Sequence, residues 1–238
     1  MIALFRACVV GLFALIAAAA PASAKDGGIL VFGASGQLGS EIVKSLVGAG
    51  HDVSVFVRAG SKAERLAGLK VTTVTGDVLK DDDVAAALKA VKYATVIDAL
   101  ARGEAGPEFY ITSQKHIAAW AKATGVKHVI LHSSVGAGAS RAIYPAAMLP
   151  RMGATLDAKE AGEKALMASG VAYTIIRNAV LMPHGTPATG KAKLYDDEAK
   201  YGSVTRADLA VLTLSCIDNP GCANKIYHAV DESLPVRR

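Results

Sequence analysis

Three glycines at every third position, Gly33, Gly36 and Gly39, follow an apolar run over residues 29–32 and precede an amphipathic run over residues 41–47. This order of strand, tight turn and helix is typical of a dinucleotide pyrophosphate site. The first glycine permits the turn, the second lets backbone approach the pyrophosphate, and the third lets helix and strand pack closely. Helix-start N–H groups and the helix dipole favour a phosphate there. The alternative is an ordinary glycine-rich turn without a ligand.

A cation follows the second expected strand, which covers residues 52–57. In folds that bind NAD, an acidic residue near this position accepts hydrogen bonds from the ribose hydroxyls. Here the strand ends in Arg58, followed by Ser61 and Lys62. A guanidinium can pair with a 2′-phosphate, so the position indicates a preference for NADP over NAD. The alternative is a solvated surface arginine.

Other polar side chains come directly after predicted strands. Asp77 follows the strand expected over residues 70–75, and Ser133 and Ser134 follow the one over residues 127–132. Residues at the carboxyl ends of parallel strands line the ligand crevice of open α/β sheets. We therefore treat these residues as site candidates. For the two serines, the alternative is that their hydroxyls cap a turn.

The elements that must position these residues alternate between strand and helix. Apolar runs predict strands over residues 29–32, 52–57, 70–75, 94–100, 127–132, 172–176 and 225–230. Helices are expected from Pro107 to Gly125, over 155–169 and over 205–217, with irregular loops over 139–150 and 177–202. This alternation predicts an α/β fold with a single doubly wound parallel sheet, the Rossmann fold, and helices on both faces.

The first 24 residues have the pattern of a secretory signal peptide. Arg6 precedes an apolar run over residues 9–20, and Ala22-Ser23-Ala24 has the small-x-small form of a cleavage site. We expect cleavage after Ala24, export to the periplasm or secretion, and no stable membrane span in the mature chain. The alternative is an uncleaved anchor, but the run is short for a span of about 20 residues. The domain then covers residues 25–238, with a small C-terminal substrate-pocket region.

Composition and cysteine usage narrow the remaining classes. The formal charge of +5 is modest, and the sequence contains no basic stripe with interleaved aromatic residues. We therefore expect no nucleic-acid partner. Cys216 and Cys222 flank a turn-like segment; they form a disulfide after export, or remain two separate thiols. Residues 81–83, all Asp, fit a helix start better than a metal site, because no His accompanies them. We expect no metal.

Taken together, these motifs resemble the atypical short-chain dehydrogenase/reductase group, the NAD(P)-binding proteins of NmrA-like and biliverdin-reductase-B-like type. The matching segments cover nearly the whole mature chain and are residues 31–39, 55–58, 76–78, 128–135, 159–163, 169–177 and 203–210. The resemblance implies a Rossmann fold, NADP(H) as cofactor and redox chemistry on a small-molecule substrate. It says nothing about the oligomeric state.

The resemblance also assigns residues to parts of the cofactor. It implies pyrophosphate contacts from Gly33, Ser35, Gly36, Gln37 and Leu38, a 2′-phosphate contact from Arg58, adenine contacts from Asp77 and Val78, ribose-side contacts from Ala99, Leu100 and Ala101, nicotinamide contacts from Ser133 and Lys159, and Arg177 beside the pocket.

One position departs from the main short-chain dehydrogenase pattern. That pattern has a tyrosine four residues before the lysine, as proton donor to a carbonyl; here Thr155 precedes Lys159. Threonine is no comparable acid near neutral pH, so the proton must come from elsewhere, with His184, Tyr144 and water as candidates. The candidate catalytic residues are therefore Ser133, Lys159 and His184. Lys159 has a plainer alternative as a solvated helix residue paired with Glu163.

Three functions remain to be compared. The first is an NADPH-dependent reductase of a small organic acceptor, such as a carbonyl compound, a quinone or a flavin. The second is a non-catalytic NADP(H)-binding sensor or regulator of NmrA-like type. The third, a nucleotide-sugar epimerase or dehydratase, usually needs the Tyr–Lys pair and a larger C-terminal domain, and this chain has neither. Export creates a conflict, because NADPH is not expected to be abundant outside the cytoplasm. Either the signal-peptide interpretation is wrong, or the cofactor is scavenged, or the Rossmann site binds something else.

Overall fold

The computed structural model describes residues 27–236 except 62, 102 and 104. The expected signal peptide and its cleavage after Ala24 lie outside the described residues. Within the described part, no helix combines the length and the apolar character that crossing a bilayer requires.

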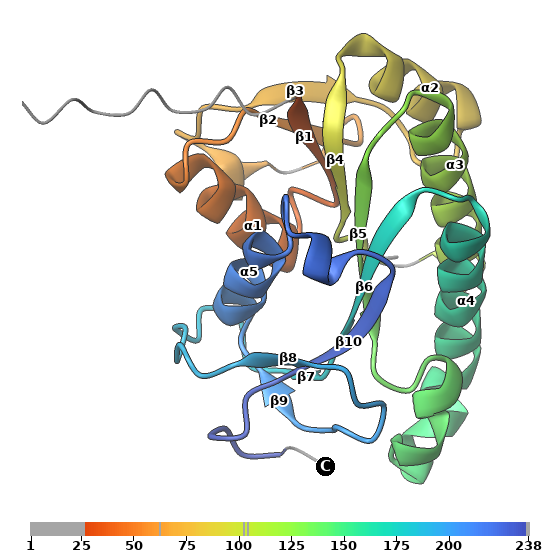
Figure 1. Cartoon of the computed structure of the whole chain (residues 1–238), viewed down its shortest axis with the longest axis vertical. Coiled ribbons are helices and arrows are strands. Elements are labelled where there is room, and N and C mark those ends of the chain that lie inside the picture. Colours follow the sequence, from red (N-terminus) through yellow and green to blue (C-terminus); the bar gives the residue numbers. More distant parts are fainter. Residues whose placement is uncertain (1–26, 62, 102, 104, 237–238) are drawn as a thin grey trace, which may run out of the picture.

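The centre of the molecule is an eight-stranded sheet with the order β3-β2-β1-β4-β5-β6-β10-β8 (Figure 1). Its strands are β1 Gly28–Phe32, β2 Val53–Val57, β3 Thr72–Thr75, β4 Tyr93–Asp98, β5 His128–Ser134, β6 Ala172–Asn178, β8 Lys193–Tyr195 and β10 Lys225–Val230. All pairings are parallel except that of β8 with β10. The strand order reverses between β1 and β4, which is where ligands bind in folds of this kind. The predicted Rossmann fold is confirmed.

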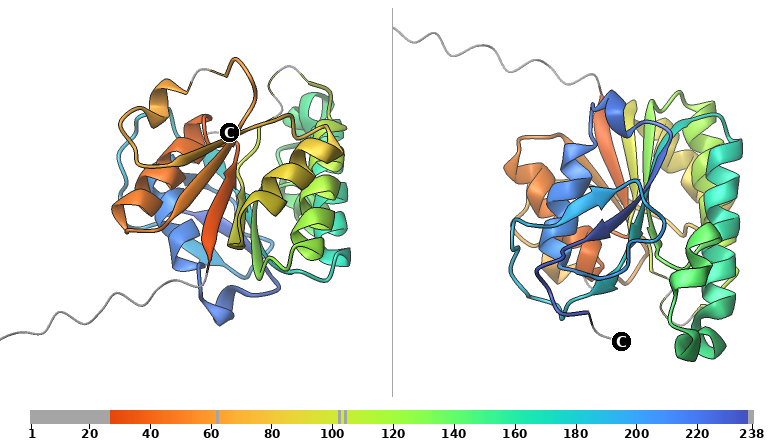
Figure 2. Two further views of the ribbon diagram at one scale, coloured as in Figure 1. Left: turned by 90° about the horizontal axis from the view of Figure 1, so that it is seen from above. Right: turned by 60° about the horizontal axis from the view of Figure 1, so that its bottom comes forward.

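Helices cover both faces of the sheet (Figures 1 and 2). The helices α1 Gln37–Gly48 and α5 Arg206–Ser215 pack on one face, and α2 Asp81–Ala90, α3 Phe109–Ala123 and α4 Leu149–Ala168 pack on the other. The alternation of side chains along a strand divides the apolar residues of β1 between two cores. Ile29 and Val31 belong to the core under α1 and α5, whereas Leu30 and Phe32 belong to the core under α2, α3 and α4.

Two regions differ from the sequence-based expectation. The helix expected from residue 155 begins at Leu149, because Pro150 lies in the first turn, where a missing N–H removes no helical hydrogen bond. The segment over 177–202 is partly ordered: β8 adds an antiparallel edge strand, and β7 Val180–Leu181 pairs with β9 Ser203–Val204 as a separate two-stranded sheet. The sheet is therefore mostly parallel rather than fully parallel.

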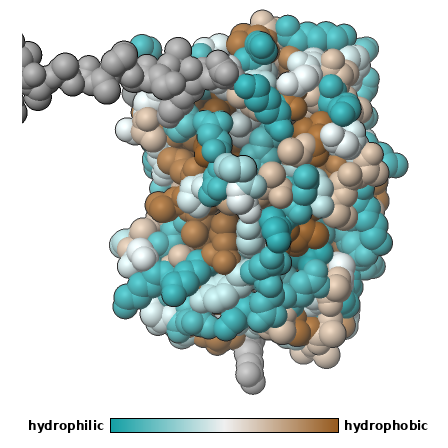
Figure 3. All heavy atoms as spheres, in the orientation of Figure 1, coloured by the Kyte–Doolittle hydropathy of each residue, from teal (hydrophilic) through white to brown (hydrophobic). Residues whose placement is uncertain are grey.

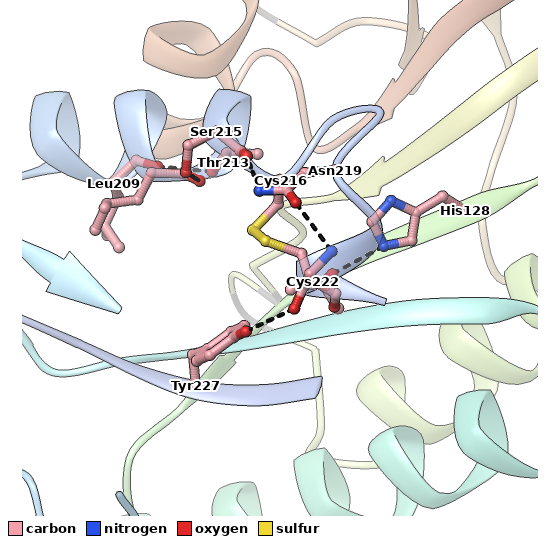
Figure 4. Close-up of a disulfide and its surroundings, with 11 residues drawn as sticks. His128, Leu209, Thr213, Ser215, Cys216, Asn219, Cys222 and Tyr227 are labelled. Carbon is pink, nitrogen blue, oxygen red and sulfur yellow. Dashed lines mark hydrogen bonds between the residues drawn. A yellow bond between two sulfur atoms is a disulfide. The ribbon is translucent and has the colours of Figure 1, made fainter. Parts of the chain in front are cut away.

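A disulfide joins Cys216 to Cys222, with a Cα–Cα distance of 5.4 Å (Figure 4). It connects the C-terminus of α5 to η4 Pro220–Cys222, the short helix that precedes β10. Thr174 of β6 donates a hydrogen bond to the Cys222 carbonyl over 2.7 Å, which ties this turn to the sheet. Of the two alternatives that the sequence left open, the structure therefore has the disulfide.

The surface shows no broad apolar region on the face drawn in Figure 3, where brown residues occur in small separate groups. The large apolar side chains that are well exposed lie apart along the described chain, at Leu79, Val91, Met148, Val211 and Val236. Groups of three or more His, Cys, Asp or Glu side chains arranged to hold a metal are absent from the described residues.

Candidate active site

The glycine-rich turn between β1 and α1 has the close packing that its spacing predicts. Gly33 has a φ of +75°, and a Cβ there would lie 2.5 Å from the carbonyl oxygen of Ala99. A Cβ at Gly39 would lie 2.2 Å from the carbonyl oxygen of Gly33. Gly36 is the N-cap of α1 and donates its N–H to the Gly33 carbonyl over 2.9 Å. The turn thus brings the N-terminus of α1 against the carboxyl ends of β1 and β4.

A cleft made of adjoining cavities lies along these strand ends. It consists of two cavities that share Gly36, Ala99, Leu100 and Ala101. The first, which we call the Arg58 cavity, has a volume of about 440 Å³ and is lined by Ser35, Arg58, Asp77 and Val78 among others. The second, the Lys159 cavity, has a volume of about 380 Å³ and includes Gln37, Leu38, Tyr110, Ser133, Lys159 and Arg206 in its lining.

The cleft brings together nearly every residue that the resemblance assigned to the cofactor. The residues from that set that line it are Gly33, Ser35, Gly36, Gln37, Leu38, Arg58, Asp77, Val78, Ala99, Leu100, Ala101, Ser133 and Lys159. They come from the ends of β1 to β5 and from α1 and α4, so one ligand spanning both cavities would contact all of these elements.

Arg177 is the exception among the predicted cofactor residues. Its guanidinium is buried and donates to both carboxylate oxygens of Glu163, over 3.2 and 2.8 Å, and to Glu198 over 3.4 Å. Arg177 is not one of the described residues that line the cleft. Arg177 thus forms an ion pair that holds β6 against α4.

His184 and Tyr144, the two side chains considered as proton donors, are also outside the cleft lining. His184 is exposed in the loop after β7. Tyr144 packs against Gly136, whose hypothetical Cβ would lie 2.4 Å from the Tyr144 ring. The structure therefore does not bring His184 together with Ser133 and Lys159 in one cavity lining.

Lys159 is not the solvated surface residue that its plainer alternative describes. Its Nζ lies 4.1 Å from the centre of the Tyr110 ring, and Glu163, the expected partner, is only 1% exposed and pairs with Arg177 instead. Burial lowers the pKa of Lys159 to about 8, although the charges of Asp98 and Glu163 oppose the shift. The amine is thus mostly protonated at neutral pH and close to losing its proton.

Asp98 is a charged group in the cleft region that the sequence did not single out. It is the last residue of β4, is only 4% exposed, and accepts the N–H of Leu100 over 2.9 Å. Burial raises the pKa of Asp98 to about 6, against the opposing effects of that hydrogen bond and of the Lys159 charge. Its position directly at a strand end is a signal that sequence inspection could have used.

His132 was also missed, and it has a structural role in the neutral form. Its Nδ1 lies 3.1 Å from Asn178 Oδ1 and its Nε2 lies 2.9 Å from Thr213 Oγ1. Burial lowers the pKa of His132 to about 4, so the ring carries no charge at neutral pH. It lines the Lys159 cavity and connects β5, β6 and α5, in a contact between segments far apart in the sequence.

The cleft suits a dinucleotide on grounds that the structure itself supplies. The close-packed glycine turn presents the N-terminus of α1 between the two cavities, where a pyrophosphate is favoured. Arg58 lies exposed at one end. At the other end, the hydroxyl of Ser133 is buried without a hydrogen-bond partner among the described residues, as expected of a group that a ligand satisfies.

The fold and this cleft define a dinucleotide-binding protein of the Rossmann class. The chain belongs to the NAD(P)H-binding family, whose model matches residues 33–220, and the resemblance to atypical short-chain dehydrogenase/reductases is confirmed. NAD(P)H azoreductase from Xenophilus azovorans is 24% identical over 84% of this chain and 66% of that protein. Quinone oxidoreductase 2 from Escherichia coli K12 is 27% identical over 86% of this chain and 69% of that protein. The chain thus spans about two thirds of the length of these curated relatives.

Among solved structures, ChuY from Escherichia coli O157:H7, described as an anaerobillin reductase, superposes with a TM-score of 0.79. The two chains are 25% identical, and the alignment covers 88% of this chain and all of ChuY.

Proposed function

We propose that the protein is an NADPH-dependent reductase of a small organic acceptor such as a carbonyl compound, a quinone or a flavin. The observation that carries this proposal is the pair of adjoining cavities, one lined by Arg58 and the other by Ser133 and Lys159. The names of the relatives, an azoreductase, a quinone oxidoreductase and an anaerobillin reductase, point to the same kind of chemistry.

The cofactor would lie along the strand ends. The N–H groups at the start of α1 and the adjacent Gly36 would bind the pyrophosphate, and Arg58 would pair with the 2′-phosphate. Asp77 and Val78 line the cavity that would hold adenine. When bound, the nicotinamide supplies the hydride, and the protein's own part is to orient the ring and the acceptor.

The acceptor would occupy the remainder of the Lys159 cavity. Leu38, Ala179 and Leu181 give this cavity apolar walls, while Lys159 and Arg206 place cations in them. An apolar pocket with a few polar groups is typical of a small-molecule site. We assign the role of proton donor in the reduction to Lys159. Its ammonium has a pKa of about 8, close to neutral pH, which suits a general acid. Thr155 cannot replace the usual tyrosine in this role.

A panel of quinones, flavins and aldehydes tests the proposal through steady NADPH oxidation. We expect Lys159→Met to abolish turnover, whereas Lys164→Met should keep it. Lys164 is a matched control because it lies on the same helix, is 67% exposed and pairs with Glu160. Gly36→Asp, which places a carboxylate at the pyrophosphate position, should abolish NADPH binding. Unchanged binding in that variant would refute the cofactor site.

The second candidate function is a non-catalytic NADP(H) sensor. It is favoured by Thr155, which is buried one helical turn before Lys159 and provides no acid at the position of the usual tyrosine. A sensor would bind NADPH and oxidise it with no member of the acceptor panel. The two functions are therefore separated by the same assay.

We further propose that the mature protein is exported. The signal-like N-terminus predicts it, and the Cys216–Cys222 disulfide supports it, because disulfides persist mainly in oxidising compartments. Native mass spectrometry of the protein from its own cell compartment tests this. A chain that begins at Lys25 with NADP bound would support an exported dinucleotide protein. A chain that retains residues 1–24 would contradict export with cleavage.

A further inference from the structure

A small recess lies at the back of the Lys159 cavity, where α3 and α4 meet the ends of β4 and β5. It has a volume of about 10 Å³. The side chains that enclose it include Asp98, Tyr110, Gln114, Ser133 and Lys159. Three of them, Tyr110, Ser133 and Lys159, also line the larger cavity, so the recess adjoins the proposed acceptor site.

The recess contains polar atoms that the protein leaves without partners. Gln114 is 2% exposed, and neither its Oε1 nor its Nε2 has a hydrogen bond among the described residues. Ser133 is 3% exposed, and its Oγ also has no hydrogen bond among the described residues. Buried polar side chains are almost always paired with protein or with an ordered water. Three such atoms around one recess therefore indicate a bound polar molecule.

The packing of α3 on α4 keeps the Gln114 side chain at this position. A Cβ at Gly162 of α4 would lie 3.3 Å from Gln114 Cβ and 3.0 Å from the Tyr110 carbonyl oxygen. Glycine at this point lets the two helices approach closely, and the amide of Gln114 faces the recess between them.

We propose that the recess binds one water molecule, held by Gln114 and Ser133 between the Asp98 carboxylate and the Lys159 ammonium. Asp98 and Gln114 are then positioning residues that keep Lys159 charged and oriented, an inference that rests on the proposed reductase function. The volume agrees, because one buried water needs on the order of 10–15 Å³ and two to four polar partners.

The charges around Lys159 explain why this arrangement matters. The titratable or charged groups that face it from the packed elements are Asp98 of β4, His132 of β5, Tyr110 of α3, Glu163 of α4 and Arg206 of α5. His132 is neutral, and Glu163 is engaged by Arg177. Asp98 is the largest of the influences that raise the pKa of Lys159 against burial. Without Asp98, the amine would lose its proton at lower pH.

Lys159 would transfer one proton to the acceptor during the reduction. As the acceptor gains hydride from NADPH, one N–H bond of the Lys159 ammonium breaks and an O–H or N–H bond forms on the acceptor. The acceptor would gain two electrons, which bound NADPH would supply as hydride, and Lys159 would be left as a neutral amine. After the product leaves, the Lys159 amine regains a proton from solvent in the cleft. The recess water and Asp98 then hold the ammonium in place.

The first test measures the Lys159 amine in protein without cofactor or acceptor. NMR titration of protein labelled with ¹³C-lysine follows each Cε signal, and Lys159→Met identifies the signal of Lys159. We expect a midpoint near pH 8, lowered by about one unit in Asp98→Asn and by about half a unit in Gln114→Met. Lys164→Met should leave the midpoint unchanged. An unchanged midpoint in both Asp98→Asn and Gln114→Met would overturn the positioning role.

The second test is a high-resolution crystal structure of the same protein. We expect a water within hydrogen-bond distance of the Gln114 amide and of Ser133 Oγ, and its loss in Gln114→Met. A recess without density would overturn the water site. If Asp98→Asn does not fold, as thermal unfolding will show, Ser133→Ala and Gln114→Met still test the water.

The outcomes of these tests distinguish the water-site proposal from the reductase proposal. If the titration behaves as expected and no acceptor is reduced, the reductase proposal fails and the water site stands. If an acceptor is reduced and its alkaline pH limit is the same in wild type and Asp98→Asn, the positioning proposal fails and the reductase proposal stands.

Discussion

The ammonium of Lys159 lies 4.1 Å from the centre of the Tyr110 ring, so an aromatic face of α3 contacts the charged end of a side chain from α4. This contact stabilises the charged form of an amine that burial would otherwise discharge. It also places a cation at the surface of the cavity proposed for nicotinamide and acceptor.

Replacing Tyr110 tests this relationship. Tyr110→Leu should lower kcat/KM for NADPH-dependent reduction about fivefold, because a cation–π contact of about 1 kcal/mol is lost. The alkaline limit of the pH profile should also move to lower pH. Tyr110→Phe keeps the ring and serves as the control. Equal losses in the two variants would point to the hydroxyl instead of the ring face.

Arg58 is expected to determine the choice between NADP and NAD. Arg58→Ala removes the cation at the end of the cleft, so the Kd for NADPH should rise about tenfold or more, as for a lost charge-assisted contact of about 1.5 kcal/mol or more. The Kd for NADH is the internal control and should change little, because NADH has no 2′-phosphate. Calorimetric titration of both cofactors provides the comparison. Parallel changes in the two constants would contradict the assignment.

The packing of Gly39 against Gly33 predicts a position-specific loss of stability. A Cβ at Gly39 would lie 2.2 Å from the Gly33 carbonyl oxygen, so Gly39→Ala should lower the free energy of unfolding by about 2–4 kcal/mol. Gly48 of the same helix has no atom within 4 Å of such a Cβ. Gly48→Ala should be neutral, or stabilising by up to about 1 kcal/mol. Urea unfolding measures the free energy of unfolding of both variants. Equal values for Gly39→Ala and Gly48→Ala would contradict the prediction.

His132 should make stability fall on acidification. Its folded-state pKa is lowered to about 4 from an ordinary value of 6.5, so the unfolded chain binds more protons between those two pH values. The neutral ring therefore makes its full contribution to the free energy of unfolding above about pH 6.5. This contribution is lost as the pH falls towards 4, which lowers the free energy of unfolding by up to about 3 kcal/mol.

The variant His132→Gln isolates this contribution, because the opposing titration of Asp98, whose raised pKa of about 6 favours the folded state as the pH falls, is common to both proteins. The stability difference between wild type and variant should shrink between pH 7 and pH 4.5. A constant difference over that range would show that the ring titrates normally.

The Cys216–Cys222 disulfide should stabilise the fold by about 2 kcal/mol, as expected for closing a short loop in the unfolded chain. Thermal unfolding with and without a thiol reductant measures this. The double variant Cys216→Ala/Cys222→Ala should unfold at the temperature of the reduced protein and show no effect of reductant. A wild-type protein insensitive to reductant would argue against the bridge.

The sequence alone predicted the fold and many of the residues that line the cleft. Glycine spacing, apolar runs and the residue after each strand are local patterns, and parallel strands bring their carboxyl ends to one edge. Gly33, Gly36, Arg58, Asp77 and Ser133 could therefore be assigned before any coordinates, and the cleft contains all of them.

Only the tertiary structure decided which polar side chains are buried and with which partner. Arg177 pairs with Glu163 because of how β6 and α4 pack, and His184 is exposed in the loop after β7. The meeting of Asp98, Gln114 and Lys159 at one recess joins β4, α3 and α4. No periodicity or local spacing encodes that contact, since it arises from close packing between distant segments.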